Sequence, residues 1–195
     1  MTNFFIGMFL STLITAMLTT RLYRLIAWYA VNSLFLALAA MSEAVRIQDE
    51  AMLISALLTL VLKSALIPYL LKHFAVKFQA EHNITPSIKV QYLIILIPAI
   101  LVFTFYLIDP IIAGAAKNYI SLAIASLFLS LVLMIEHRNV FAKVIGFLSL
   151  ENALFLLAMT ATEGMPMLIE LGIFVDLLMA VVILNLLFKK EASHV

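Results

Sequence analysis

Residues 51–71 read AMLISALLTLVLKSALIPYLL, and within this stretch only Lys63 carries a charge. The hydrocarbon core of a bilayer is about 30 Å thick, so an α-helix that rises about 1.5 Å per residue needs about 20 apolar residues to cross it. The stretch has that length and that composition. It therefore predicts a helix that spans a membrane.

The same pattern recurs along nearly the whole chain. Apolar runs of similar length occupy residues 3–20, 25–45, 90–108, 118–135, 141–161 and 165–188. Together with 51–71 they predict an all-α polytopic membrane protein with seven transmembrane helices in a single integral membrane domain, residues 1–195. The one longer connection, residues 72–89, is expected to lie on the membrane surface as a short amphipathic piece.

The composition supports the same class and excludes others. Of the 195 residues, 65% are hydrophobic and 12% are charged, against about 45–50% apolar and about 25% charged residues in a soluble domain. The formal net charge of +1 and the absence of a basic run argue against binding to nucleic acid. The chain has no Cys, which excludes disulfides and thiolate-held metal clusters.

Lys and Arg are distributed unevenly among the predicted loops. One set of alternate loops contains nine of them, namely Arg21, Arg24, Lys72, Lys77, Lys89, Arg138, Lys143, Lys189 and Lys190, and the other set contains only Arg46 and Lys117. Cytoplasmic loops are enriched in Lys and Arg. The distribution predicts an odd number of spans, with the N-terminus outside and the C-terminus in the cytoplasm.

Three ionisable residues fall near the middle of predicted spans: Lys63, Glu151 and Asp176. A charge at that depth costs about 2.5–3.5 kcal/mol on insertion scales unless it has a partner. Counted from the helix ends at about 1.5 Å per residue, Glu151 and Asp176 lie at one depth on consecutive antiparallel helices, and Lys63 lies in a similar layer. We predict that these three residues take part in ion translocation. For Lys63, a structural role as the partner of a carboxylate stays open.

The other acids lie closer to the span ends. Glu170 is five residues inside its span, and two alternatives stay open: a role at the ion entrance or at the interface, or no role. The remaining acids, Glu136 among them, fall in or near loops and are expected to be solvated.

Neighbouring residues indicate how the three buried groups are supported. Gly172 precedes Asp176 by four residues and lets another helix approach closely. Pro68 removes the hydrogen bond to the carbonyl of Ser64, so the third predicted span is expected to contain a polar, hydrated break beside Lys63.

Two asparagines add polar groups at comparable depth, Asn32 on the second predicted span and Asn152 next to Glu151. Asn152 is expected to serve mainly in helix packing.

The sequence lacks the residue patterns of several common cofactor sites and catalytic sites. All four His residues, at 73, 82, 137 and 194, fall in loops or in the tail, so no pair is placed to hold a haem between helices. The chain contains no phosphate-binding glycine motif, zinc-binding HExxH motif or nucleophile elbow. We therefore expect no catalytic residue, metal or cofactor in this chain alone.

A family resemblance rests on the second half of the chain. Its residues are Arg138-Asn139, Ile145-Gly146, Glu151-Asn152-Ala153 and a following helix with Asp176. This part, residues 117–190, resembles the three-helix K subunit of respiratory complex I, in which the second and third helices each carry a buried glutamate. Aligned on these residues, the third-helix glutamate falls on Asp176, whereas the second-helix glutamate falls on Leu148 rather than on Glu151.

A longer resemblance covers nearly the whole chain. It rests on Tyr23-Arg24-Leu25, on Lys63 followed by Pro68, on Arg138-Asn139, Gly146 and Glu151-Asn152, and on Glu170-Leu171-Gly172-Ile173 with Asp176. In these residues the chain resembles component E of the hydrogenase 4 type, a membrane subunit of formate hydrogenlyase-like complexes. In that family a four-helix extension, here residues 1–110, precedes the K-like part.

The resemblance implies a non-catalytic membrane subunit of a redox-driven complex that translocates H⁺ or Na⁺. It implies antiporter-like membrane subunits, a membrane anchor and a peripheral hydrogenase arm as partners, with a nickel–iron centre and iron–sulfur clusters in those partners. The implied location is the plasma (inner) membrane of a bacterium or archaeon. Three alternatives stay open: a purely structural scaffold subunit, a subunit of a multi-subunit cation/proton antiporter, and a self-sufficient carrier.

Overall fold

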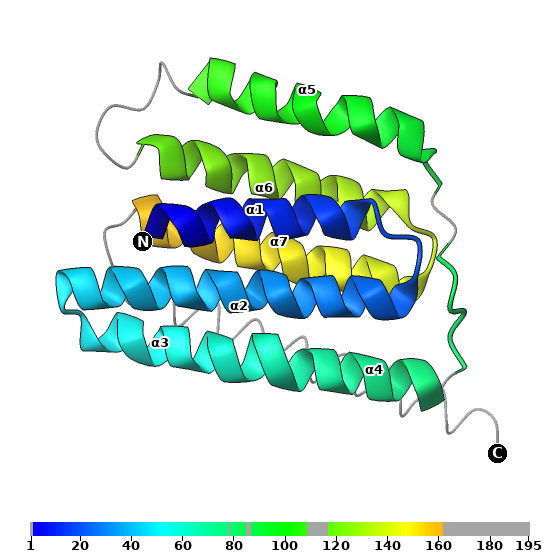
Figure 1. The fold of residues 1–195 in the computed structure, drawn as a ribbon, viewed down its shortest axis with the longest axis horizontal. Helices are drawn as coiled ribbons and strands as arrows, with labels where there is room; N and C mark the ends of the chain where they lie inside the picture. Colours follow the sequence, from blue (N-terminus) through cyan, green and yellow to red (C-terminus); the bar gives the residue numbers. More distant parts are fainter. Residues whose placement is uncertain (1, 78, 85–86, 109–116, 162–195) are drawn as a thin grey trace.

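The computed structural model describes residues 2–77, 79–84, 87–108 and 117–161, and in them every regular element is a helix. The elements are α1 (Thr2–Met17), α2 (Leu22–Ile47), α3 (Glu50–Val61), the π-helical segment η1 (Leu62–Leu66), α4 (Ile67–Lys77), α5 (Val90–Ile108), α6 (Lys117–Glu136) and α7 (Val140–Ala161). Figure 1 shows them running back and forth along one axis, with α3, η1 and α4 joined into one long rod.

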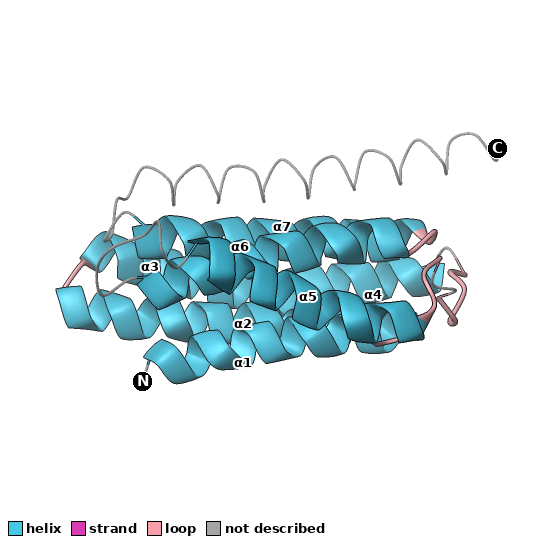
Figure 2. Ribbon diagram, turned by 90° about the horizontal axis from the view of Figure 1, so that it is seen from above, coloured by secondary structure: helices cyan, strands magenta, loops and turns pink. Residues whose placement is uncertain are grey.

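The helices form a bundle in which α2 is central. It packs against α1, α3, η1, α4 and α7, while α6 packs against α7, α1 and α5. Seen from above, the described helices lie side by side (Figure 2). α5 lies at the edge of the bundle in Figure 1 and exposes large apolar side chains, among them Ile95, Val102 and Tyr106. A helix with such an outer face needs lipid or an apolar partner around it.

In the described part of the chain, five helices are long and apolar enough to cross a membrane: Leu22–Ile47, Glu50–Lys77, Val90–Leu107, Tyr119–Glu136 and Val140–Ala161. α1 is a shorter apolar helix of 16 residues. The all-helical membrane class is therefore confirmed for the described part of the chain. The count of seven spans and the orientation of the termini stay predictions, because the seventh predicted span, 165–188, lies outside the described residues.

The helix ends follow local sequence signals. Asp49 caps α3, its Oδ1 accepting hydrogen bonds from the N–H groups of Ala51 (3.0 Å) and Met52 (3.3 Å). Asn139 caps α7 in the same way through Phe141 (2.9 Å) and Ala142 (3.4 Å). Each cap satisfies N–H groups that have no partner within the helix and so fixes where the helix begins.

The described residues of the 72–89 connection fall into two parts. Residues 72–77 continue the rod as part of α4, and residues 79–84 and 87–89, which we call the strap, are hydrogen-bonded to the α1–α2 and α6–α7 connections. Backbone hydrogen bonds hold this strap in place: Leu22 N–H to His82 O at 3.0 Å, Ile84 N–H to Thr20 O at 2.8 Å, and Ser87 N–H to Glu136 O at 2.7 Å. These bonds satisfy backbone groups of the strap. Its place on the membrane surface stays a prediction.

α6 and α7 approach each other closely at Gly146. A Cβ atom built on Gly146 would lie 2.7 Å from Cα and 2.8 Å from N of Met134 on α6. These are backbone atoms that cannot move without shifting a helix. The small residue is therefore a packing requirement of the α6–α7 pair.

We expect Gly146→Ala to lower the free energy of unfolding by about 1–3 kcal/mol, the usual cost of overpacking. The measurement is reversible unfolding of the full chain in mixed micelles. Gly7→Ala is the matched control, because a Cβ at Gly7 meets nothing within 4 Å and Ala favours the helix by up to about 1 kcal/mol. Equal effects of the two substitutions would contradict the packing argument.

Candidate functional site

Lys63 and Glu151 form an ion pair inside the bundle. Lys63 Nζ lies 3.3 Å from Glu151 Oε1, and the two side chains are only 4% and 8% exposed. Lys63 belongs to η1 and Glu151 to α7. The sequence left the partner of Lys63 open, and the structure identifies it as Glu151.

The pair lies halfway along both helices. Glu151 is eleven residues after Val140 and ten before Ala161, which is about 15 Å of helix on either side. Lys63 is thirteen residues after Glu50 and fourteen before Lys77, or roughly 20 Å from each end of the rod. The prediction that these two residues share a layer near the middle is confirmed.

The backbone is irregular at Lys63. Residues Leu62–Leu66 form a π-helical turn, closed by a hydrogen bond from Ile67 N–H to Leu62 O, five residues back. Pro68 follows as the second residue of α4. Proline lacks an N–H and its ring crowds the carbonyl four residues earlier, here that of Ser64. The wider π turn relieves that crowding, and such turns occur often at functional sites. The break was predicted from Pro68, and its hydration stays a prediction.

A chain of hydrogen bonds begins at Asn152, the residue after Glu151. Asn152 Nδ2 donates to Ser33 Oγ (2.8 Å) and to Asn32 Oδ1 (3.3 Å) on α2. Asn32 Nδ2 in turn donates to Phe9 O (2.8 Å) and Thr12 Oγ1 (3.2 Å) on α1. All four polar side chains are buried. The chain links α7, α2 and α1 and places both predicted supporting asparagines in one network.

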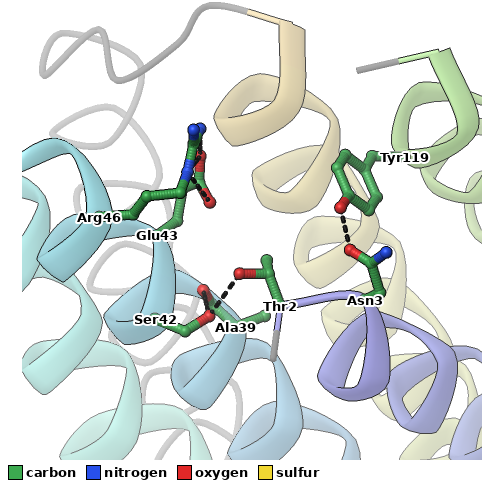
Figure 3. Close-up of polar contacts among 7 residues, drawn as sticks. All are labelled: Thr2, Asn3, Ala39, Ser42, Glu43, Arg46 and Tyr119. Carbon is green, nitrogen blue, oxygen red and sulfur yellow. Dashed lines mark hydrogen bonds and ion pairs between the residues drawn. The ribbon is translucent and has the colours of Figure 1, made fainter. Parts of the chain in front are cut away.

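The two ends of the bundle differ in charge. We call the end where α2 and α7 begin and α4 ends the basic end, because it carries Arg21, Arg24, Lys72, Lys77, Lys89, Arg138 and Lys143. At the opposite end Arg46 is paired with Glu43 on the same helix (Figure 3). Uncharged contacts tie the helices there: Thr2 Oγ1 lies 2.9 Å from Ser42 Oγ, and Tyr119 donates to Asn3. The predicted excess of basic residues on one side thus corresponds to one end of the structure.

The other predicted site residues are placed as follows. Pro68 lies one helical turn beyond Lys63 and is buried. Asp176, Glu170 and Gly172 lie outside the described residues, so their proposed roles stay predictions. The ion-translocation role of Lys63 and Glu151 likewise stays a prediction, and what the structure shows is their ion pair.

Glu136 is buried, contrary to the expectation that it is solvated. Both Glu136 and His137 are 1% exposed. Within the part of the chain that the structure describes, Glu136 Oε2 and His137 Nε2 have no hydrogen-bond partner. The strap is attached at this corner, where Ser87 N–H donates to the Glu136 carbonyl. The apolar residues Ile84 and Ile88 in the strap were the available signal, since a surface loop has little need of them.

Burial lowers the pKa of His137 from its ordinary value of 6.5, because desolvation disfavours the charged ring. Contacts with the carbonyls of Leu133 and Thr19 act in the opposite direction and are weaker. His137 therefore binds a proton at a lower pH in the folded protein than in the unfolded chain.

These features define a class: a helical membrane protein with a buried ion pair and an adjoining asparagine network. Comparison with known proteins then gives the particular relatives. The chain is 24% identical over 183 residues to Hydrogenase-4 component E of Escherichia coli K12, which covers 89% of this chain and 82% of that protein. Hydrogenase-4 component E of Shigella flexneri matches with the same identity and coverage. The resemblance to hydrogenase 4 component E noted from the residues is thus confirmed at the level of sequence similarity.

A further relative is an uncharacterized protein of Mycobacterium tuberculosis. It is 25% identical over 168 residues, covering 84% of this chain and 75% of that protein. No family model and no solved structure matches the chain. The division into an N-terminal extension and a K-like part stays a prediction.

The asparagine network generates a test by double-mutant cycle. Asn152→Ala and Ser33→Ala, singly and together, should show a coupling energy of about 0.5–1.5 kcal/mol, the range of interhelical hydrogen bonds in membranes. The measurement is the free energy of unfolding of the full chain in mixed micelles. Ser33→Ala with Thr104→Ala is the control cycle, because Thr104 Oγ1 bonds the carbonyl of Ile100 in its own helix. Additivity in the Asn152 cycle would refute the link.

The buried His137 generates a test by pH. Because its folded-state pKa is lowered, its contribution to stability is fully present above 6.5 and is lost as pH falls through the folded-state value. On acidification below pH 6.5, the wild-type chain should lose more unfolding free energy than His137→Gln. His73→Gln, at an exposed position, should follow the wild type. Parallel curves for wild type and His137→Gln would contradict the argument.

Proposed function

We propose that this chain is a non-catalytic membrane subunit of a redox-driven, ion-translocating complex of the hydrogenase type, and that Lys63 and Glu151 transfer H⁺ or Na⁺ within it. The similarity to Hydrogenase-4 component E supports the kind of complex. The apolar helices support the place of the subunit in the membrane. The observation that carries the proposal is the ion pair of 3.3 Å between Lys63 and Glu151, halfway along two helices.

A buried ion pair is a costly way to hold helices together. Taking two charges out of water is expensive, and apolar side chains of similar size often give equal or greater stability. Membrane-embedded ionisable residues accordingly mark ion and proton pathways more often than structural joints. The pairing of Lys63 with Glu151 is therefore better explained by a task that needs charge at this depth.

Charge coupling supplies the mechanism. A proton that reaches Glu151 neutralises the carboxylate and so removes the negative charge 3.3 Å from the Lys63 ammonium. A carboxylate elsewhere on the path is then favoured in its ionised form and releases its own proton, so that the charge moves while the total stays constant. We propose Asp176 as that second exchanging carboxyl and Glu170 as an entrance group.

The polar groups around the pair support a path that runs sideways through the bundle. Asn152, Asn32, Ser33 and Thr12 extend from α7 across α2 to α1 at the level of Glu151. Hydroxyl and amide groups can hold water in register for proton transfer where apolar side chains cannot. The π turn at Lys63 adds backbone groups outside the regular helical pattern.

In the proposed complex, other subunits would carry the redox centres. We propose antiporter-like membrane subunits, a membrane anchor and a peripheral hydrogenase arm as partners, with the nickel–iron centre and the iron–sulfur clusters in that arm. The plasma membrane of a bacterium or archaeon is the proposed location. The outer apolar face of α5 is a surface against which a membrane subunit or lipid could pack.

A purely structural scaffold is the second candidate, and the asparagine network favours it. Hydrogen bonds between α7, α2 and α1 hold a bundle together whether or not any ion moves. The two functions differ in what they require of the ion pair: a scaffold tolerates its replacement by apolar side chains, and an ion path does not.

The deciding experiment uses the assembled complex in proteoliposomes, with electron transfer and ion uptake measured in parallel. With Glu151→Gln, uptake per electron should fall about tenfold or more, because Gln removes both the exchangeable proton and the negative charge that faces Lys63 at 3.3 Å. Assembly and electron transfer should persist. Glu43→Gln is the matched control, an acid paired with Arg46 at the end of its helix, and it should leave uptake unchanged.

A second variant separates loss of function from loss of fold. Lys63→Leu with Glu151→Leu replaces the pair by apolar groups and should assemble at least as well as the wild type. On the proposed function it transfers no ion, and on the scaffold function it is fully active. Normal uptake in this assembled variant would overturn the proposal.

A further inference from the structure

A groove lies between α2 and α4 near the basic end, away from the ion pair. Its volume is about 250 Å³, and its lining comprises Tyr23, Ile26, Ala27, Pro68, Tyr69 and Lys72. The lining residues of α2 are spaced by three and four, as are those of α4, so each helix presents one face to the groove. Ala27 and Lys72 are exposed, and Tyr69 is 68% exposed, so the groove opens to the outside of the bundle.

The polarity of this groove changes with depth. Tyr23 is the second residue of α2, and Lys72 lies five residues before the end of α4. One turn further from the basic end lie Ile26 and Ala27 on α2 and Pro68 on α4. The groove thus presents hydroxyl and ammonium groups near the end of the bundle and an apolar floor toward its middle. A phospholipid has this polarity along the bilayer normal, with its phosphate above its acyl chains.

The charge selects the kind of phospholipid. Lys72 is the charged residue of the lining, and no acid takes part in it. Arg21, Arg24, Lys77 and Lys89 lie at the same end of the bundle, with Glu81 as the acid of the strap. Basic pockets between helices on the side of the positive loops bind anionic head groups, and each Lys or Arg near an anionic surface favours binding about fivefold.

We propose that this groove binds one anionic phospholipid. Its phosphate contacts Lys72 and the hydroxyls of Tyr23 and Tyr69, and the upper part of an acyl chain lies on Ile26, Ala27 and Pro68. Aromatic side chains at this level of a membrane protein commonly sit at the head groups. Lipid binding in the groove does not require ion transfer by Lys63 and Glu151, so the two functions are tested separately.

The test uses the full chain in nanodiscs of equal parts phosphatidylcholine and phosphatidylglycerol with the same acyl chains. Native mass spectrometry of the released protein measures how much of each lipid remains bound. The wild-type chain should retain phosphatidylglycerol over phosphatidylcholine, and Lys72→Gln should lower that preference about fivefold. Lys143→Gln is the matched control, an exposed lysine of α7 at the same end and outside the groove, and it should behave as the wild type.

A steric variant tests the groove itself. Ala27→Trp fills the apolar floor from an exposed position and should abolish retention of both lipids while the helical circular dichroism is unchanged. Equal preferences in Lys72→Gln and Lys143→Gln, or undiminished retention in Ala27→Trp, would overturn the proposal. A photoreactive amino acid at Ala27 in native membranes should crosslink to phospholipid, and crosslinking to a protein subunit instead would also overturn it.

Discussion

Where water is excluded, every polar group on these helices must find its partner within the protein, and this constraint governs the middle of the bundle. Lys63 meets it through Glu151, and Asn152 meets it through Ser33 and Asn32. Glu151 and Asn152 are adjacent in sequence, so they point about 100° apart around α7. One is directed to η1 and the other to α2, and the pair of contacts fixes the rotation of α7. The network that holds α7 in place is therefore also what aims the carboxylate at Lys63.

Much of this arrangement could be predicted from the sequence. In a helix that crosses a bilayer, the number of residues between a side chain and the helix end gives the depth of that side chain in the membrane. Apolar runs predicted the described helices to within about three residues at each end, except that the rod Glu50–Lys77 extends six residues beyond the predicted span 51–71. Counting from the ends placed Lys63 and Glu151 in one layer. Depth does not fix direction around a helix axis, so the partner of Lys63 could not be derived. The burial of Glu136 was missed for a related reason: it depends on a strap from a distant part of the chain, and the apolar residues Ile84 and Ile88 indicate that the strap packs against the protein without indicating where.

The position of Glu151 matters because the resemblance to the complex I K subunit places a glutamate at Leu148 instead. Leu148 is 1% exposed and packs in the apolar cluster toward the basic end, with Leu25, Ile26 and Ile145. Glu151 lies three residues further, about one helical turn, on nearly the same face of α7. That displacement brings the carboxylate level with the π turn, where Lys63 lies. A carboxylate at Leu148 would instead lie one turn nearer the basic end, among apolar side chains. The position of the carboxylate one turn further along α7 thus matches the position of Lys63 on η1, and the two groups can pair.

The π turn and the groove between α2 and α4 meet at Pro68. Its ring follows the irregular turn that contains Lys63, and its apolar surface forms part of the groove floor. α2 serves both regions from different positions: Asn32 and Ser33 face the network near the middle of the bundle, whereas Ile26 and Ala27 line the groove two turns closer to the basic end. A helix shared in this way can be displaced at one region only by disturbing the other, because α2 packs against η1, α4 and α7 together. The geometry of the ion pair therefore depends on contacts along the whole length of α2, and not only on the two charged residues.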